Sequence, residues 1–414
     1  MRKIIISITS LLLSIGILLF GHGLLTTLLS LRGVEEGFTE PTIGFFISMY
    51  FLGYISGTFI CPKIIKRVGH IRALSALAAI FAGISILQGF WINIAVWSAV
   101  RFASGLSIVG IYMVIESWMN SQATNETRGR IFGFYQLISL LFLASGQFLI
   151  LAGDVNELDL FAISAALICL SLVPVALTRL PEPAPVAEIK IELKDLYRLS
   201  PLSFMGCLIS GLVGSVFWGL GPLFAKQSGF TEFGIAAFMS ITILGGIVLQ
   251  LPIGLWSDKH DRRIAIMMVG FVSALMAMIA AFSPPGESYQ LSISMFIFGG
   301  MLFAIYPLSV AHANDHSESI DRVAVSTNLL LTYGIGAGIG PVFAGLMMSL
   351  TGHYFILIYF MTGGLILGAY AYHRRRHGVQ ISIEDQTNFV PQTRTSQVMP
   401  EGLYGEEEDV RGEE

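Results

Sequence analysis

Twelve apolar stretches of about 20 residues or more run through the chain and constrain its fold more than any other feature. Each can cross the hydrocarbon core of a bilayer as one α-helix, which satisfies its own backbone hydrogen bonds. Of the 414 residues, 54% are hydrophobic and 13% are charged, about half the charged fraction of a soluble domain. We predict an all-α, multi-pass membrane protein with transmembrane helices at residues 4–30, 41–61, 72–92, 94–118, 131–152, 159–179, 202–225, 232–256, 264–283, 290–311, 323–350 and 354–373.

The second half of the chain repeats the frame of the first at an offset of 194 residues. The identities that hold this offset are Phe102/Phe296, Gly105/Gly299, Tyr112/Tyr306, Asn120/Asn314, Arg128/Arg322 and Gly146/Gly340. Each copy is an apolar helix with glycines, a polar loop that closes on arginine, and another apolar helix. We therefore predict two six-helix halves at 1–180 and 202–373, a cytoplasmic central loop at 181–201, and a disordered cytoplasmic tail at 374–414.

Basic residues outside the helices fall almost entirely in alternate loops. If the N-terminus is cytoplasmic, the outer loops hold only Arg32 and Lys226 among the basic residues. Lysine and arginine favour the cytoplasmic side of a membrane protein. Both termini are therefore predicted to lie in the cytoplasm.

The loop after the eighth stretch carries a recognisable motif. The segment Gly254-Leu-Trp-Ser-Asp258-Lys259-His-Asp261-Arg262-Arg263 matches Gly-x-x-x-Asp-Arg/Lys-x-Gly-Arg-Arg, with Asp261 in place of the second glycine. With its twelve stretches and repeated halves, the chain resembles the major facilitator superfamily (MFS) from Ile4 to His373. Within it the chain is similar to the small bacterial YcaD-like branch at GHIRA (69–73), ESWMN (116–120), NETRGR (125–130) and AHAND (311–315). The resemblance implies the MFS fold in the bacterial cytoplasmic (inner) membrane.

The motif also predicts a cytoplasmic gate. In the family its carboxylate faces the N-terminus of a helix in the other half, so Asp258 is predicted to lie near Ile131 when the cytoplasmic side is closed. The first half has Lys66 where the pattern has an acid, which leaves one such latch. A drug-antiport signature is not found, because Gln147 follows Gly146 where the family has proline.

Buried charge in the first half gives the leading site candidate. Arg101 lies within the fourth stretch, and Tyr112 and Glu116 fall on the same helical face. An arginine at this depth is costly unless it is paired or faces water, so we predict that Arg101 binds substrate or the coupling charge. The alternative is a structural arginine that caps carbonyl groups or extends its head toward the interface.

Four further residues are candidates for substrate binding or proton coupling: His22, Tyr112, Trp218 and Tyr306. A histidine titrates near neutral pH and can carry a proton, although His22 between two glycines also fits helix packing. Trp218 can stack on a ring or simply fill the bundle.

Glu116 lies near the predicted cytoplasmic end of its helix, so Arg67 or Arg72 in the adjoining loop is its predicted partner. Glu126, Arg128 and Arg130 are predicted to extend this network, with a solvated loop as the alternative. The predicted gate comprises Glu116, Arg67, Arg72, Glu126, Arg128, Arg130, Gly254, Asp258, Lys259, Arg262 and Arg263.

The sequence carries no nucleotide-binding lysine loop, no Cys/His cluster and no nucleophile motif, so no enzymatic activity, cofactor or metal is predicted. We predict a secondary active transporter of a small organic solute, working by alternating access and coupled to protons as a symporter or antiporter. Its predicted partners are the substrate, protons and the lipid bilayer, without nucleic acid, and the protein is predicted to be a monomer. The alternative is a non-transporting sensor or a lipid-modifying enzyme on the same scaffold.

Overall fold

A computed structural model describes residues 2–178, 183, 193–317, 322–377, 381–387 and 389. Twelve helices in this part of the chain are long and apolar enough to span a membrane, and the described residues form no strand. The predicted all-α fold is therefore confirmed. The α-helices are α1 (Arg2–Glu35), α2 (Glu40–Val68), α3 (His70–Phe90), α4 (Ile94–Gln122), α5 (Asn125–Gly146), α6 (Asp159–Leu170), α7 (Leu172–Ala176), α8 (Leu193–Leu199), α9 (Pro201–Gln227), α10 (Glu232–Ser257), α11 (Arg262–Ala281), α12 (Tyr289–Asp315), α13 (Arg322–Thr351) and α14 (Phe355–His377).

Two predicted spans differ in detail from single straight helices. The fifth ends in a 3₁₀ turn, η1 (Gln147–Ala152), and the sixth is divided into α6 and α7 at Ser171. The hydroxyl of Ser14 donates to the carbonyl of Ser171 over 2.5 Å, so α1 satisfies a carbonyl group at this break.

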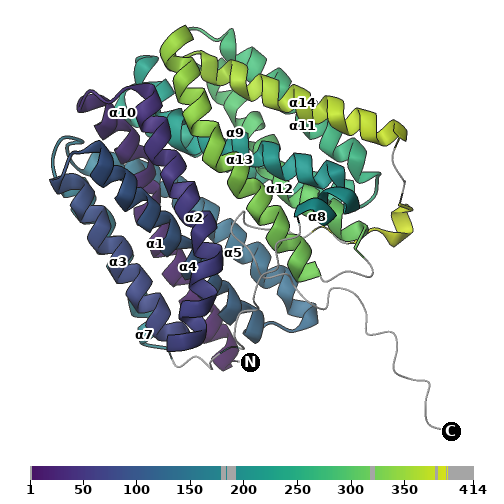
Figure 1. Cartoon of the computed structure of the whole chain (residues 1–414), viewed down its shortest axis with the longest axis horizontal. Coiled ribbons are helices and arrows are strands. Elements are labelled where there is room, and N and C mark those ends of the chain that lie inside the picture. The colour runs from purple at the N-terminus through teal and green to yellow at the C-terminus, as the bar shows by residue number, and fades with distance from the viewer. Residues whose placement is uncertain are drawn as a thin grey trace.

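The long helices run side by side, with α1 to α5 on one side of the bundle and α9 and α11 to α14 on the other (Figure 1). Successive spans end alternately at two faces of the molecule. We call the face with the beginning of α1 and the end of α14 the terminal face, and the other the opposite face. The distribution of basic residues predicts that the terminal face is cytoplasmic.

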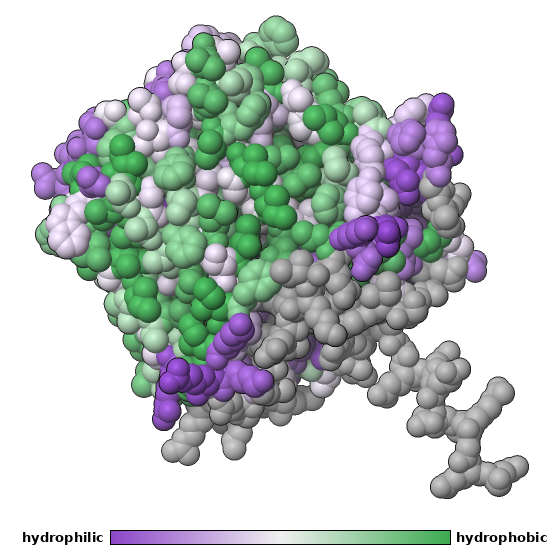
Figure 2. Space-filling model, in the orientation of Figure 1, coloured by the Kyte–Doolittle hydropathy of each residue, from purple (hydrophilic) through white to green (hydrophobic). Residues whose placement is uncertain are grey.

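Apolar side chains cover the outside of the bundle. Figure 2 shows them across the middle of the visible face, with hydrophilic residues gathered at its edges. Large exposed apolar residues include Leu13, Ile80, Phe134, Val248 and Ile366. A surface of this kind is favourable only against lipid, so the sides of the bundle form the membrane-embedded surface.

The two halves meet closely toward the opposite face. Contacts between them are the ion pair Lys226–Glu35 at 3.0 Å, the hydrogen bond from Gln227 to Glu40 at 2.7 Å, and the bond from the Ser30 hydroxyl to the Gly219 carbonyl at 2.6 Å. Backbones also touch, because a Cβ added to Gly44 of α2 would lie 2.2 Å from the carbonyl oxygen of Pro341 in α13. This conformation is closed at the opposite face.

The prediction of a disordered tail from residue 374 is wrong for its first part. The helix α14 continues to His377, and residues 381–387 and 389 return to the terminal face with a 3₁₀ turn, η2 (Ile383–Asp385). Thr387 and Phe389 are each only 6% exposed there. The acidic end of the tail led to the prediction that the whole segment is solvated. Burial of the Phe389 ring, however, stabilises the docked segment through the hydrophobic effect. Residues 390–414 lie outside the described part of the chain.

Candidate functional site

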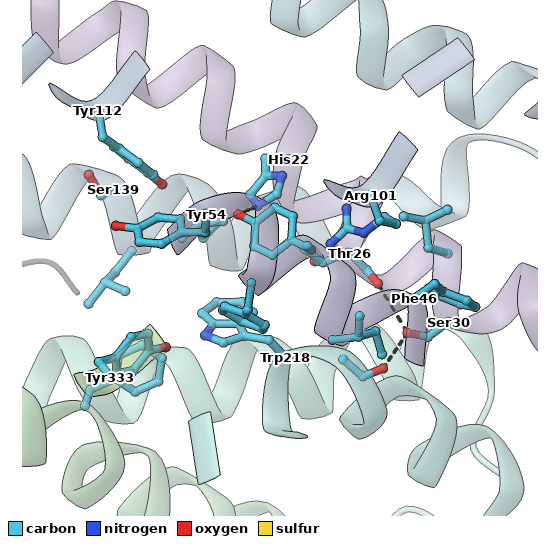
Figure 3. A pocket seen from close by; sticks show the side chains of 18 of the residues that line it. His22, Thr26, Ser30, Phe46, Tyr54, Arg101, Tyr112, Ser139, Trp218 and Tyr333 are labelled. Carbon is cyan, nitrogen blue, oxygen red and sulfur yellow. Dashed lines mark hydrogen bonds between the residues drawn. The ribbon is translucent and has the colours of Figure 1, made fainter. Parts of the chain in front are cut away.

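A cavity lies between the halves, and the centre of a water molecule can move through about 140 Å³ of it. Its walls come from α1, α2, α4 and α5 of the first half and from α9, α12 and α13 of the second. Figure 3 shows its polar and aromatic side chains converging on one space. The lining residues are His22, Thr26, Leu29, Ser30, Phe46, Ile47, Tyr50, Phe51, Tyr54, Arg101, Tyr112, Gln136, Ser139, Leu140, Leu143, Trp218, Gly219, Phe303 and Tyr333.

Arg101 enters this cavity from α4. The helix begins after Asn93, whose side chain accepts hydrogen bonds from the N–H groups of Ala95 and Val96, and this cap places Arg101 about two turns inside the membrane-spanning segment. Its side chain is 4% exposed, and its guanidinium carbon lies 4.3 Å from the ring centroid of Tyr50. Nε and Nη1 of Arg101 have no hydrogen-bond partner within the described residues.

The ring of Tyr50 does not compensate for burying this charge. A desolvated cation–π contact contributes roughly 2 kcal/mol, whereas removing a guanidinium from water costs several kcal/mol unless it is paired and hydrogen-bonded. Arg101 is therefore a charged donor that lines a cavity and finds no acceptor for two of its nitrogens in the described part of the protein. Chemically, such a group can donate hydrogen bonds to an anion or to another acceptor.

His22 of α1 lies on the same tyrosine. Its Nε2 is 3.5 Å from the hydroxyl oxygen of Tyr50, at the limit of a hydrogen bond, and the two rings are stacked with centroids 5.9 Å apart. Phe81 contacts the imidazole from α3 at 5.6 Å. The structure thus brings together His22 and Arg101, which are 79 positions apart in the sequence, around one aromatic ring.

Aromatic rings form most of the remaining wall. Trp218 packs against Phe217 and Phe303, with ring centroids 5.3 and 6.0 Å away, and so presents a rigid face to the cavity. Of the two predicted tyrosines, Tyr112 lines the cavity, whereas Tyr306 is completely buried, with its ring centroid 5.7 Å from that of Tyr333. Tyr306 does not line the cavity in this conformation, so its contact with substrate stays a prediction.

The described lining contains no aspartate, glutamate or lysine, so Arg101 provides the fixed charge of the wall. Polar side-chain groups other than Arg101 and His22 are hydroxyls, the indole N–H of Trp218 and the amide of Gln136, which lies 3.4 Å from the amide of Gln250 across the halves. A cavity of this composition suits an anionic or neutral molecule with an apolar or aromatic body. A cationic substrate would find no countercharge among these residues.

Glu116 lies deeper toward the terminal face and does not pair with its predicted partners. Its side chain is completely buried, and Oε1 accepts a 3.0 Å hydrogen bond from the hydroxyl of Tyr135 in α5. Arg67 and Arg72 are exposed, and neither forms an ion pair with this described carboxylate. The arginines flank the junction of α2 and α3, whereas Glu116 lies within the buried part of α4, where Tyr135 reaches it.

The other first-half gate candidates separate in the structure. Arg128 is 8% exposed at the start of α5, whereas Arg130 is exposed. The side chain of Glu126 lies outside the described residues. A gate at this place therefore stays a prediction, with Arg128 as its buried basic member.

The motif between α10 and α11 forms a network of carboxylates and guanidinium groups. Arg262 is 1% exposed and pairs with Asp258 at 3.0 Å and with Asp315 of α12 at 2.7 Å. Asp261 caps α11 by accepting a 3.0 Å bond from the N–H of Arg263, and it also pairs with that side chain at 2.8 Å. The aspartate that replaces the family's glycine therefore has a structural role.

Asp258 bonds to Phe389 and Arg262 in this conformation, and not to the described residues of α5. Its oxygens accept bonds from the N–H of Phe389 at 2.9 and 3.1 Å. Burial raises the pKa of the Asp258 carboxyl, and the Phe389 N–H and the Arg262 guanidinium oppose that rise. Gly254 packs against the ring of Phe389, and Lys259 is exposed. The latch near Ile131 stays a prediction for the conformation in which the terminal face is closed.

Three tyrosines of the cavity were not predicted from the sequence: Tyr50, Tyr54 and Tyr333. Tyr50 and Tyr54 are four residues apart in α2 and so lie on one face of the helix. Two tyrosines at this spacing in the middle of a span were a usable signal, because tyrosine otherwise concentrates near the membrane surface. The sequence around Tyr333 has no second tyrosine at helical spacing and is rich in the glycines of α13, so it gave no such signal.

Comparison with known sequences gives consistent relatives. The family model described as Major Facilitator Superfamily matches residues 11–327 and 203–396. An uncharacterized MFS-type transporter of Enterobacter sp. (strain 638), Ent638_1421, is 30% identical over 351 residues, covering 82% of this chain and 88% of the relative. The uncharacterized MFS-type transporter YcaD of Salmonella arizonae is 29% identical over 335 residues, covering 78% and 84%.

Solved structures share the fold at low sequence identity. The nucleoside transporter NupG superposes with a TM-score of 0.73 at 15% identity, covering 91% of this chain and 100% of that one. A bacterial homologue of the human lysosomal transporter Spinster, in an inward-facing and unoccupied conformation, gives 0.70 at 16% identity, covering 92% and 98%. These likenesses concern the fold alone.

Proposed function

Because the chain belongs to the Major Facilitator Superfamily and is a secondary transporter, we propose that it carries a small organic anion with an aromatic or apolar body. Movement follows alternating access, in which the halves rock around a cavity at the middle of the membrane. Arg101 binds the anionic group, and Trp218 and Tyr50 pack against the body of the substrate.

The observation that carries this proposal is the guanidinium of Arg101, which is buried, lines the cavity and has two nitrogens without an acceptor among the described residues. An incoming carboxylate supplies both a countercharge and acceptor oxygens, in a geometry that arginine favours. A bound anion therefore satisfies the buried guanidinium, which gives it an advantage over a neutral analogue of the same shape.

We place proton coupling at His22, which lies beside the same tyrosine. With Arg101 alone nearby, a second positive charge on the imidazole is unfavourable. An anion bound between the two groups removes that repulsion and favours the imidazolium, so substrate and proton bind together. Glu116, hydrogen-bonded to Tyr135, is the alternative proton carrier on the path to the terminal face.

We assign the structure to the inward-facing state, in which substrate would exchange with the cytoplasm. Its opposite face is closed by Lys226–Glu35 and by the backbone contact of Gly44 with Pro341. If the terminal face is cytoplasmic, as the basic residues predict, the present conformation is the inward-facing one. The return state requires α2 and α13 to separate at the opposite face.

A thermal-shift screen tests the substrate class. Aromatic and aliphatic carboxylates are compared with their uncharged amides on the purified full-length protein, since a ligand at 100 times its dissociation constant adds about 2.7 kcal/mol to stability. At least one carboxylate should raise the melting temperature of the wild type more than its amide does. Arg101→Gln, which keeps a polar side chain and removes the charge, should lose this preference. A set of binders that stabilises both proteins equally would refute the role of Arg101.

A further inference from the structure

The described end of the tail is held against the terminal face by the motif between α10 and α11. We call residues 381–387 and 389 the C-terminal strap. It contains η2 and ends at Phe389, where α10 meets α11. Ile383 is 51% exposed on its outer side, whereas Thr387 and Phe389 are buried. The strap therefore has an inner side that contacts the protein and an outer side that does not.

The inner side is bound by both carboxylates of the charge network. Asp315 accepts hydrogen bonds from the N–H and the hydroxyl of Thr387, at 2.8 and 2.6 Å. Asp258 accepts the N–H of Phe389, and Arg262 donates to the carbonyl of Thr387. Hydrogen bonds to charged groups in buried surroundings are the stronger class. The strap thus uses backbone groups that any sequence carries, with Thr387 adding one side-chain donor.

Phe389 supplies the apolar contact. A Cβ added to Gly254 would lie 2.1 to 2.5 Å from atoms of the Phe389 ring, so the ring lies directly on the glycine backbone. The whole phenylalanine is 6% exposed. An aromatic ring from the tail therefore packs on Gly254, the first glycine of the motif, and a larger residue at this position would exclude that ring.

The binding of Asp258 has a consequence for the transport cycle. The strap, Asp258, Arg262 and Asp315 all belong to the second half of the molecule, so these bonds do not tie the halves together. They do occupy the carboxylate that the sequence motif predicts to engage the N-terminus of α5 when the terminal face closes. One carboxylate cannot accept from the strap and from α5 in the same geometry.

We propose that the C-terminal strap is an autoinhibitory contact, which keeps the terminal face open by occupying Asp258 and the surface of Gly254. This inference rests on the proposed alternating access. Release of the strap frees Asp258 for the latch, and the population with the opposite face open then rises. A partly buried charge at a helix N-terminus contributes up to about 2 kcal/mol, so the rise is at most roughly thirtyfold.

The test combines two measurements on the full-length protein in lipid nanodiscs. Hydrogen exchange of peptides covering residues 381–389 reports whether the strap is docked. Pulsed electron paramagnetic resonance between spin labels at Thr39→Cys and Glu232→Cys, with Cys61, Cys169 and Cys207 replaced, reports the separation of the halves at the opposite face. Neither measurement needs a substrate.

Phe389→Pro is the main variant, because proline has no N–H for Asp258 and also removes the ring. Thr387→Val removes one donor to Asp315 at nearly constant volume, and the exposed Ile383→Ala is the matched control. We expect slow exchange of the strap in the wild type and in Ile383→Ala. Phe389→Pro should exchange rapidly and show a larger population at the longer distance, with Thr387→Val between them.

Rapid exchange of the strap in the wild type would overturn the proposal, and so would release of the strap in Phe389→Pro with unchanged distances. Gly44→Ala, which introduces a clash between α2 and α13 at the opposite face, separates the two proposals. If Gly44→Ala yields the longer distance and Phe389→Pro does not, the strap has no inhibitory role. If neither variant yields it, alternating access itself fails, and the inhibition fails with it.

Discussion

Gly44 offers the sharpest test of movement between the halves. A Cβ on this glycine would lie 2.2 Å from the carbonyl oxygen of Pro341 and 2.8 Å from its carbon. Backbone atoms of α13 cannot rotate away as a side chain can. Ordinary contact begins at about 3.4 Å, so Gly44→Ala forces α2 and α13 apart by roughly 1 Å at this level.

The energetic size of this change follows from overpacking. An added methyl group against fixed backbone costs about 1–3 kcal/mol. If the opposite face opens during the cycle, the open conformation avoids this cost, and its population relative to the closed one rises about 5- to 150-fold. Spin labels at Thr39→Cys and Glu232→Cys should then report a second, longer distance in Gly44→Ala.

Two glycines provide the controls. Gly270→Ala places its Cβ 2.6 Å from the backbone nitrogen of Gly368, which lies in the same half, so this variant should lose stability without changing the distance. Gly83 of α3 has no atom within 4 Å of the position that a Cβ would take, so Gly83→Ala should change neither. If Gly44→Ala behaves as Gly270→Ala does, with a lower melting temperature and one distance, the closed face is rigid packing and the reasoning is refuted.

Further predictions concern single side chains. His22→Gln should flatten the pH dependence of transport; an unchanged profile would move the proton to Glu116. Tyr135→Phe removes the bond to Glu116 and should slow transport by about tenfold or less, a loss of about 1 kcal/mol; transport at the wild-type rate would refute this. Arg101→Lys should recover little binding, because an ammonium does not replace the planar donor fork; a binding curve like that of the wild type would contradict it. Outside the membrane, hydrogen bonds from Thr231 lower the pKa of the Glu287 carboxyl. A carboxyl group with a lowered pKa stabilises the folded protein at pH values above the pKa of the unfolded chain, and this contribution is lost on acidification. Glu287→Gln should therefore have a lower melting temperature than the wild type at neutral pH, and the difference between the two melting temperatures should close below pH 4.5.

Hydrophobic length and repetition were sufficient to predict the twelve spans, because each helix must be long enough to cross the bilayer whatever its neighbours are. The break at Ser171 was not predictable from the same pattern. The carbonyl group there accepts a hydrogen bond from a hydroxyl of α1 that lies 157 residues away in the chain. Local apolarity predicts that a helix spans the membrane but does not predict where a neighbour interrupts it.

The residues of the candidate site that the sequence predicted, such as Arg101 and His22, are those whose burial in lipid is costly in free energy whatever their neighbours are. Residues were missed or wrongly placed where their position depends on packing between helices that are distant in the sequence. Tyr306 matches Tyr112 in the repeat, yet it is completely buried against Tyr333 and does not line the cavity. Arg67 and Arg72 were chosen for Glu116 because they lie in the adjoining loop, but Tyr135 of the next span reaches that carboxylate instead. The contact between the strap and the terminal face was not predicted, because its hydrogen bonds are mainly formed by backbone groups, which produce no sequence pattern.

The central claim is that Arg101 binds the anionic substrate in the cavity between the halves. Its most direct test is counterflow of a carboxylate identified by the thermal-shift screen, in proteoliposomes containing the wild type or Arg101→Gln. We predict saturable exchange by the wild type and none above empty liposomes by Arg101→Gln, with both proteins giving the same opposite-face distance. Equal exchange by the two proteins would contradict the claim.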